Sequence, residues 1–247
     1  MSKISNTLNS LFYIRKTFKY IKANPWSWKY LIIPFFINLV LSIALWIFLF
    51  NLIQGFVLGL GFLSIIPGFL TGIISFLVLV ITFLTTIYLF FLLANIIASP
   101  FNGLLTDRML SMAGIESENK TDVVTLVIRE ILRAIKFEVL KLVLVLLLFI
   151  FGLIISVIPV IGVILAGLVN FIGNTYLSLV DYFDPGLSYK GVDVSGKFKY
   201  VKHIVKDSWG FFLVSGLIMY IPLINIVYIP LAVITANLVL IEKDKSS

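Results

Sequence analysis

The sequence contains no cysteine and a single histidine, His203. Without cysteine the chain has no disulfide, no thiolate metal site and no cysteine nucleophile. A single histidine excludes a metal site with two histidine ligands from one chain. Charged residues make up only 13% of the chain, whereas 60% are apolar and the mean hydropathy is +1.11. Soluble domains carry about 25% charged residues. The composition therefore predicts a membrane protein and excludes a soluble enzyme.

Three long stretches contain no Asp, Glu, Lys, Arg or His: residues 30–106, 142–180 and 208–241. A transmembrane helix needs about 20 apolar residues to cross the hydrocarbon core of a bilayer. Each stretch is therefore long enough to enter a membrane. All the charge, with a net value of +7, lies in the segments outside these stretches.

The first uncharged stretch predicts two transmembrane helices, over residues 31–53 and 69–98. The second helix is longer than a bilayer requires, so we expect it to tilt or to protrude. Residues 54–68 form a glycine-rich, uncharged connector between them. Because proline disfavours helical backbone at the residue before it, we expect the second helix to end just before Pro100. Asn102 would then cap a new helix.

The other two stretches are too long for one upright helix and too short for two full helices and a turn. Proline interrupts each near its middle, within Ile158-Pro159-Val160-Ile161 and Ile221-Pro222-Leu223-Ile224. Proline removes a helical hydrogen bond and clashes with the preceding turn. Each stretch is therefore predicted to fold back as a re-entrant helical hairpin, covered by protein or by a water-filled cavity. The alternative is one long, kinked helix through each proline.

We expect an all-α membrane protein with a single polytopic domain, residues 1–247. Its predicted parts are a basic interfacial helix at 1–29, two long transmembrane helices within 30–98, a cytoplasmic helical segment at 99–141, a hairpin at 142–180, a cytoplasmic segment at 181–207, a second hairpin at 208–241 and a tail at 242–247. Lysine and arginine mark the cytoplasmic side of a membrane protein, and segment 1–29 has both and no acid. Two spans and two hairpins return every charged segment to that side.

Basic, amphipathic stretches precede the apolar ones. In residues 1–24 the apolar face consists of Leu11, Ile14, Phe18 and Ile21, and lysines and an arginine flank it. This pattern is typical of a helix that lies among lipid headgroups, and we do not expect a cleavable signal peptide. Residues 122–141 also form an amphipathic helical pattern, with Glu138 as the one charge on its apolar face.

No acid, base or nucleophile suited to catalysis lies within the uncharged stretches, and no phosphate-loop, dinucleotide or zinc motif occurs. We therefore expect no enzyme, no cofactor, no metal and no nucleic-acid partner. A helix that begins inside a membrane directs its free N–H groups at whatever occupies the space before it. The second limbs of the hairpins, starting near Pro159 and Pro222, could bind an anion in this way. Alternatively, these prolines only make turns.

Four sequence pieces resemble the family of the CysZ sulfate permease and the etoposide-induced protein 2.4. They are Leu31-Ile32-Ile33-Pro34-Phe35-Phe36-Ile37-Asn38, Ala98-Ser99-Pro100-Phe101-Asn102-Gly103-Leu104-Leu105, Ile158-Pro159-Val160-Ile161-Gly162, and Asp181-Tyr182 followed by Ile221-Pro222-Leu223-Ile224-Asn225. The second piece is the most specific. The resemblance covers nearly the whole chain.

The resemblance implies a multi-pass protein of the bacterial inner membrane that is often oligomeric. It also implies conduction of sulfate for cysteine synthesis. Two pieces depart from the family pattern. Trp26-Ser27-Trp28-Lys29 stands where sulfate-linked members usually carry a Gly-Leu-Arg-Arg-like stretch, and Phe183-Asp184-Pro185-Gly186 follows Asp181-Tyr182 where the family tends to have proline next. The first change replaces bidentate arginine donors with one lysine.

Our first hypothesis is an inner-membrane channel or permease for sulfate or a similar small anion. The candidate binding residues are those at the start of the first span and at the two proline breaks: Ser27, Trp28, Lys29, Pro159, Gly162, Pro222 and Asn225. The expected partners are this anion, membrane lipids and further copies of the chain. The second hypothesis is a membrane-shaping or scaffold protein, whose basic helices bind anionic lipid and whose hairpins wedge into one leaflet.

Overall fold

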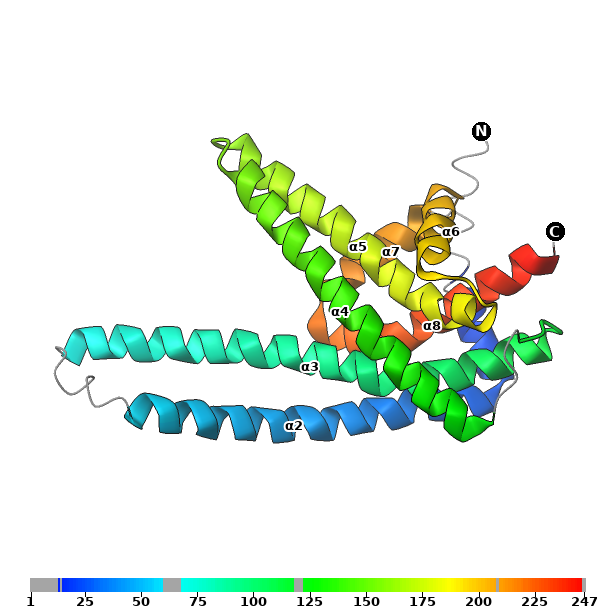
Figure 1. Ribbon diagram of the computed structural model, residues 1–247, viewed down its shortest axis with the longest axis horizontal. Coiled ribbons are helices and arrows are strands. Elements are labelled where there is room, and N and C mark those ends of the chain that lie inside the picture. Colours follow the sequence, from blue (N-terminus) through cyan, green and yellow to red (C-terminus); the bar gives the residue numbers. More distant parts are fainter. Residues whose placement is uncertain (1–12, 14, 60–67, 118–121, 208, 246–247) are drawn as a thin grey trace. The chain divides into compact units, whose positions relative to one another are not determined.

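The computed structural model describes residue 13 and residues 15–59, 68–117, 122–207 and 209–245. These residues are almost entirely helical and include no strand, so the predicted all-α class is confirmed. After a helical segment at 15–23 come η1 (Pro25–Ser27), α2 (Trp28–Gly59), α3 (Gly68–Met112), α4 (Val123–Ser156), α5 (Ile161–Tyr189), α6 (Val194–Asp207), α7 (Trp209–Met219) and α8 (Pro222–Lys245) (Figure 1).

The chain divides into two compact units. Residues 1–32 and 99–247 form the first unit, and residues 33–98 form the second. Among the described residues, three helical stretches are long and apolar enough to cross a membrane: Pro25–Ile53, α4 and α5. A shorter apolar helical stretch, Gly72–Thr86, lies within α3. The protein is therefore an all-α membrane protein, as the composition predicts.

The second unit consists of the inner parts of α2 and α3, which run antiparallel. The Asn38 amide donates a 3.4 Å hydrogen bond to the Ala94 carbonyl. Further along, the Trp46 and Phe83 rings meet edge to face with centroids 5.9 Å apart. Both helices expose large apolar side chains, among them Val40, Phe48 and Phe76. Such surfaces are suited to contact with lipid.

In the first unit α5 contacts α4, α6, α7 and α8. Its buried face carries Leu179, Val180 and Phe183, which form a core with apolar residues of the other helices, including Phe211 of α7 and Ala236 of α8. A smaller cluster joins Ile21 and Leu31 to the end of α3 and to α8. Figure 1 shows α4 and α5 as a long antiparallel pair whose tip projects away from α6, α7 and α8.

The helices are interrupted at both predicted prolines. α4 ends at Ser156 and α5 begins at Ile161, so the chain reverses over residues 157–160. α7 ends at Met219, and α8 begins with Pro222. Proline suits the first position of a helix because the N–H it lacks would have no partner in the helix. No described helix continues through either proline.

Two boundaries differ from the sequence prediction. The expectation that a helix ends before Pro100 is wrong, because α3 continues through this proline to Met112. The boundary between the segment 99–141 and the hairpin 142–180 is not a helix end, because α4 continues through it. No proline occurs in α4, and its start is fixed by Asp122, whose carboxylate accepts a 3.2 Å hydrogen bond from the Thr125 N–H.

Candidate functional site

The three predicted residues before the first span differ in their accessibility. Ser27 is buried, and its hydroxyl donates a 2.7 Å hydrogen bond to the Asn24 carbonyl, so it is turned away from solvent. Trp28 and Lys29 are exposed. The Lys29 ammonium lies 4.9 Å from the centroid of the Tyr30 ring, within the range of a cation–π contact. Only Trp28 and Lys29 are therefore available to a ligand.

Pro159 and Gly162 lie at the tip of the α4–α5 hairpin. The first two N–H groups of α5 already have partners in the turn: Ile161 donates to the Pro159 carbonyl at 2.7 Å and Gly162 donates to the Ile158 carbonyl at 2.9 Å. A Cβ on Gly162 would lie 3.1 Å from the Ile158 Cβ and closer still to backbone, so glycine here permits the tight turn. The start of α5 therefore offers fewer free donors than the sequence suggested.

Pro222 and Asn225 lie in the first turn of α8. Figure 1 shows the tip of the α4–α5 hairpin well apart from the start of α8. The structure thus distributes the predicted residues over three places of the first unit, at the start of α2, at the hairpin tip and at the start of α8. It does not gather them around one cavity.

A buried ionic cluster that the sequence analysis did not identify lies where α4, α5 and α6 meet. Its four members are Glu130 and Arg133 of α4, Asp184 of α5 and Lys197 of α6. Arg133 forms ion pairs with both Glu130 and Asp184, and the Lys197 ammonium lies 2.6 Å from the Asp184 carboxylate. Glu130, Asp184 and Lys197 are at most 5% exposed. Two cations therefore converge on one carboxylate inside the helical bundle.

Uncharged groups complete the cluster. The Lys197 ammonium donates a second hydrogen bond, of 2.6 Å, to the Ser188 hydroxyl. The Ser99 hydroxyl donates to the Glu130 carbonyl at 3.0 Å and accepts a longer bond from the Arg133 guanidinium. Buried charges are tolerated when they are paired. Each charge of this cluster has an opposite charge beside it, and the formal charge of the four side chains is zero.

A second ionic group lies nearby along the same two helices. The Lys141 ammonium of α4 lies 2.5 Å from the Glu138 carboxylate and 2.7 Å from the Asp181 carboxylate of α5. Lys141 and Asp181 bound the apolar stretch 142–180, so this group lies where the uncharged parts of α4 and α5 begin. It joins the two helices at the base of the hairpin.

One cation of the cluster affects the pKa of the other. Burial, and then the neighbouring Arg133 guanidinium, lower the pKa of Lys197 to about 8. The carboxylates of Glu130 and Asp193 act in the opposite direction and favour the charged form, so the lysine is charged at neutral pH. Its charge is nevertheless the one in the cluster that a moderate rise in pH removes.

The sequence contained one signal of buried charge. Glu138 falls on the apolar face of its helix, and a lone charge on such a face indicates a buried partner. Glu130 and Arg133 fall on the polar face and look solvated in the sequence. They are largely covered because α5 and the later part of α3 pack against this face, which no local pattern predicts. Within the described residues no group of His, Asp and Glu could hold a metal ion.

Comparison with known proteins identifies the family of the chain. A family described as sulfate transporter CysZ/etoposide-induced protein 2.4 matches residues 13–230. The protein named sulfate transporter CysZ of Vibrio atlanticus (strain LGP32) is 25% identical over 228 residues, which cover 91% of this chain and 89% of that protein. The family match covers well over half of the residues. The chain therefore belongs to the sulfate transporter CysZ/etoposide-induced protein 2.4 family.

Proposed function

We propose that the protein is a multi-pass permease of the bacterial inner membrane that passes sulfate or a similar small anion into the cell for cysteine synthesis. The observation that carries this proposal is the convergence of Arg133 and Lys197 on the Asp184 carboxylate. Family membership and the name of the Vibrio relative support the same substrate class. No step of this function requires the chain to act as an enzyme.

The Asp184 carboxylate has the chemistry of the proposed substrate. A carboxylate and a sulfate both present oxygens that share a negative charge, and a guanidinium binds either with two parallel hydrogen bonds. An entering anion can thus replace Asp184 on Arg133 and Lys197 without leaving either cation unpaired. Without a bound anion the cluster has no net charge, so it does not hold an anion from solution permanently. Weak, exchangeable binding of this kind is what conduction requires.

Access to the cluster is proposed to begin at exposed cations. Lys29, with Trp28 beside it, lies at the start of α2 and is available to an anion in solution. A lysine is a point charge with three donors, so it attracts an anion without fixing its orientation. We assign to Lys29 the role of concentrating anions and to Arg133 the role of recognising them.

Flux of labelled sulfate into vesicles tests this function. The purified full-length chain is incorporated into vesicles beside its Arg133→Gln variant and its Lys136→Gln variant. Lys136 is an exposed cation of the same helix, α4. We expect uptake above empty vesicles for the original chain and for Lys136→Gln, and a loss for Arg133→Gln. Equal, background uptake by all three folded proteins would overturn the permease and favour a membrane-shaping role.

A further inference from the structure

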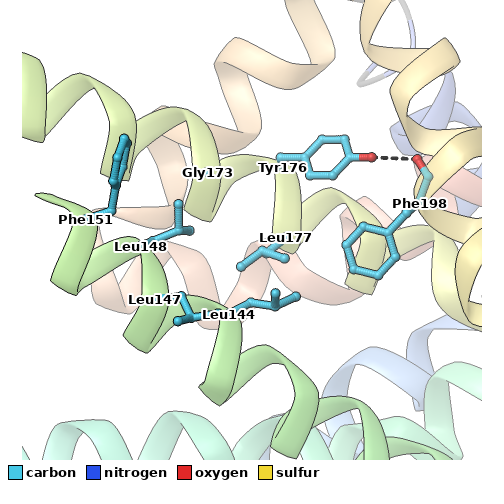
Figure 2. A pocket seen from close by; sticks show the side chains of 8 residues that line it. All are labelled: Leu144, Leu147, Leu148, Phe151, Gly173, Tyr176, Leu177 and Phe198. Carbon is cyan, nitrogen blue, oxygen red and sulfur yellow. Dashed lines mark hydrogen bonds between the residues drawn. The ribbon is translucent and has the colours of Figure 1, made fainter.

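An apolar groove lies beside the hairpin, separate from the ionic cluster. Its volume is about 420 Å³, and it is open on one side and lined by α4, α5 and α6. Figure 2 shows Leu148 and Phe151 on α4, Gly173 and Tyr176 on α5, and Phe198 on α6 around this space. Its volume falls within the range of about 300–1,000 Å³ for small-molecule sites.

The lining of the groove offers no free polar group. Tyr176 has the one polar side chain in it, and its hydroxyl donates a 2.5 Å hydrogen bond to the Phe198 carbonyl, drawn as a dashed line in Figure 2. This bond ties α6 to α5 at one end of the groove. A hydroxyl already used in this way leaves only hydrocarbon for an occupant to contact, so the groove suits an alkyl chain.

Gly173 creates part of the space. A Cβ at this position would lie 2.6 Å from the nearest Leu148 methyl carbon, so any larger residue pushes against the opposite wall. By contrast, Gly167, six residues earlier on α5, is exposed and has open space around its Cβ position. The two glycines therefore form a matched pair, one in the groove and one outside it.

The end of the groove at α6 is next to a basic face. Lys202 is one turn after Phe198 and hence on the same side of the helix. Lys199 and Lys202 are exposed, and no ion pair among the described residues uses them. Lys197 points elsewhere, to Asp184. An alkyl chain in the groove would therefore have a cation beside its end.

We infer that the groove binds one acyl chain of an anionic phospholipid, whose headgroup phosphate contacts Lys202. The helices that line it, α4 and α5, are long and apolar enough to cross a membrane, so the open side of the groove faces lipid. Charge complementarity selects the headgroup: a basic residue near a membrane surface attracts anionic lipid. This site is independent of the proposed transport and would hold the hairpin and α6 together.

Lipid binding to the full-length chain in detergent tests the inference, with native mass spectrometry as the measurement. The probes are phosphatidylglycerol and phosphatidylcholine with identical acyl chains. For the original chain we expect phosphatidylglycerol to bind about fivefold more tightly, the effect of one lysine near a headgroup. Lys202→Gln should remove this preference by weakening the binding of phosphatidylglycerol more than that of phosphatidylcholine, because the choline cation already offsets the phosphate charge. Lys136→Gln, an exposed lysine of α4, is the control and should keep the preference.

The groove itself is tested by filling it. Gly173→Leu should weaken the binding of both lipids by about tenfold or more, because the acyl chain loses contacts that bury its methylene groups. Gly167→Leu should leave the binding of both lipids unchanged. If Gly173→Leu does not fold, Leu147→Trp fills the groove from α4, and Leu146→Trp, which is exposed outside it, is the control. Equal binding of the two lipids, or full binding by the filled variants, overturns the inference. So does a stable dimer that binds no lipid, because a second copy would then cover the groove.

Discussion

Gly103 of α3 lies directly against the Glu130 side chain of α4. A Cβ on Gly103 would be 2.5 Å from the Glu130 Cγ and 2.8 Å from its carboxyl carbon. The absence of a side chain at residue 103 therefore makes room for a buried carboxylate that holds Arg133. A glycine within the most specific family-like piece of the sequence thus supports the ionic cluster, a role that the sequence analysis did not assign to it.

The first prediction concerns this contact. Gly103→Ala should displace Glu130 and lower the free energy of unfolding by about 1–3 kcal/mol, the usual effect of overpacking. Thermal unfolding in detergent measures the change. Gly167→Ala is the control, since its Cβ meets no atom within 4 Å, and it should be neutral or slightly stabilising because alanine favours helix. Equal melting temperatures for both variants would contradict the contact.

Removing the carboxylate shared by the two cations gives the second prediction. Asp184→Asn leaves Arg133 and Lys197 with one anion fewer in a buried place, so stability should fall by about 3–5 kcal/mol. Added sulfate should restore part of this loss by occupying the vacated position. The measurement is the melting temperature against sulfate and chloride concentration.

The control for the shared carboxylate is Asp244→Asn. Asp244 pairs with Lys190 at the surface, and exposed pairs contribute about 0–1 kcal/mol. It should melt like the original chain and show no added response to sulfate. If Asp184→Asn responds to sulfate no more than to chloride, the cluster is a structural ion network and not an anion site.

Prolines show how far the sequence could predict this fold. Pro34, Pro100, Pro185 and Pro230 all lie inside helices, whereas the helices break at Pro159 and start anew at Pro222. The sequence rule is the same for each: a lost hydrogen bond and a clash with the preceding turn. Packing of neighbouring helices decides which prolines are tolerated. Uncharged runs therefore predicted the helices well, but not where each one ends.

The ionic cluster illustrates the same limit for the site. Uncharged stretches located the membrane-entering segments because that signal is local. Arg133, Asp184 and Lys197 come together only when α4, α5 and α6 pack. Their spacing along the chain does not predict this contact. The candidate residues at the prolines were predicted because a helix start offers free N–H groups. At the start of α5 the turn itself already uses the first of these groups.

The third prediction is that arginine cannot be replaced at residue 133 by another cation. Arg133 contacts two carboxylates from two helices, which suits a planar guanidinium with several donors. Arg133→Lys should retain the fold but reduce sulfate flux by about tenfold, and Arg133→Gln should reduce it further. Vesicle uptake with Lys136→Gln as control measures both. Full flux in Arg133→Lys would show that charge alone suffices.

The fourth prediction is a pH dependence that originates from Lys197. Its folded pKa of about 8 lies below the value of about 10.4 for an unfolded lysine. Between these values the unfolded chain binds more protons, so the contribution of Lys197 to stability rises as pH increases from about 8 to about 10.4. Sulfate flux should change in the opposite direction and fall above pH 8, because a cation is lost from the site.

Lys197→Met provides the comparison for the pH dependence, because methionine has a similar length and no charge. Its flux should be low at every pH, and its stability should lack the rise above pH 8. Lys202→Met, at an exposed residue of the same helix, should keep both profiles. A fall in flux above pH 8 that persists in Lys197→Met would assign the effect to another group.

The hairpin tip gives the last prediction. Val160 has φ +62° and ψ −57°, and the Ile161 N–H bonds to the Pro159 carbonyl across it. This is a γ-turn of the rare, strained kind, held by a β-branched residue that is 83% exposed. Glycine adopts such backbone without a steric penalty. Val160→Gly should therefore raise the free energy of unfolding by up to about 1 kcal/mol, because relief of about 1–3 kcal/mol of strain exceeds the entropy that glycine adds to the unfolded chain.

Thermal unfolding measures this change in stability, with Val157→Gly as the control. Val157 is similarly exposed but has helical φ and ψ, so glycine there should only destabilise. Loss of stability in both variants would show that the tip is relaxed.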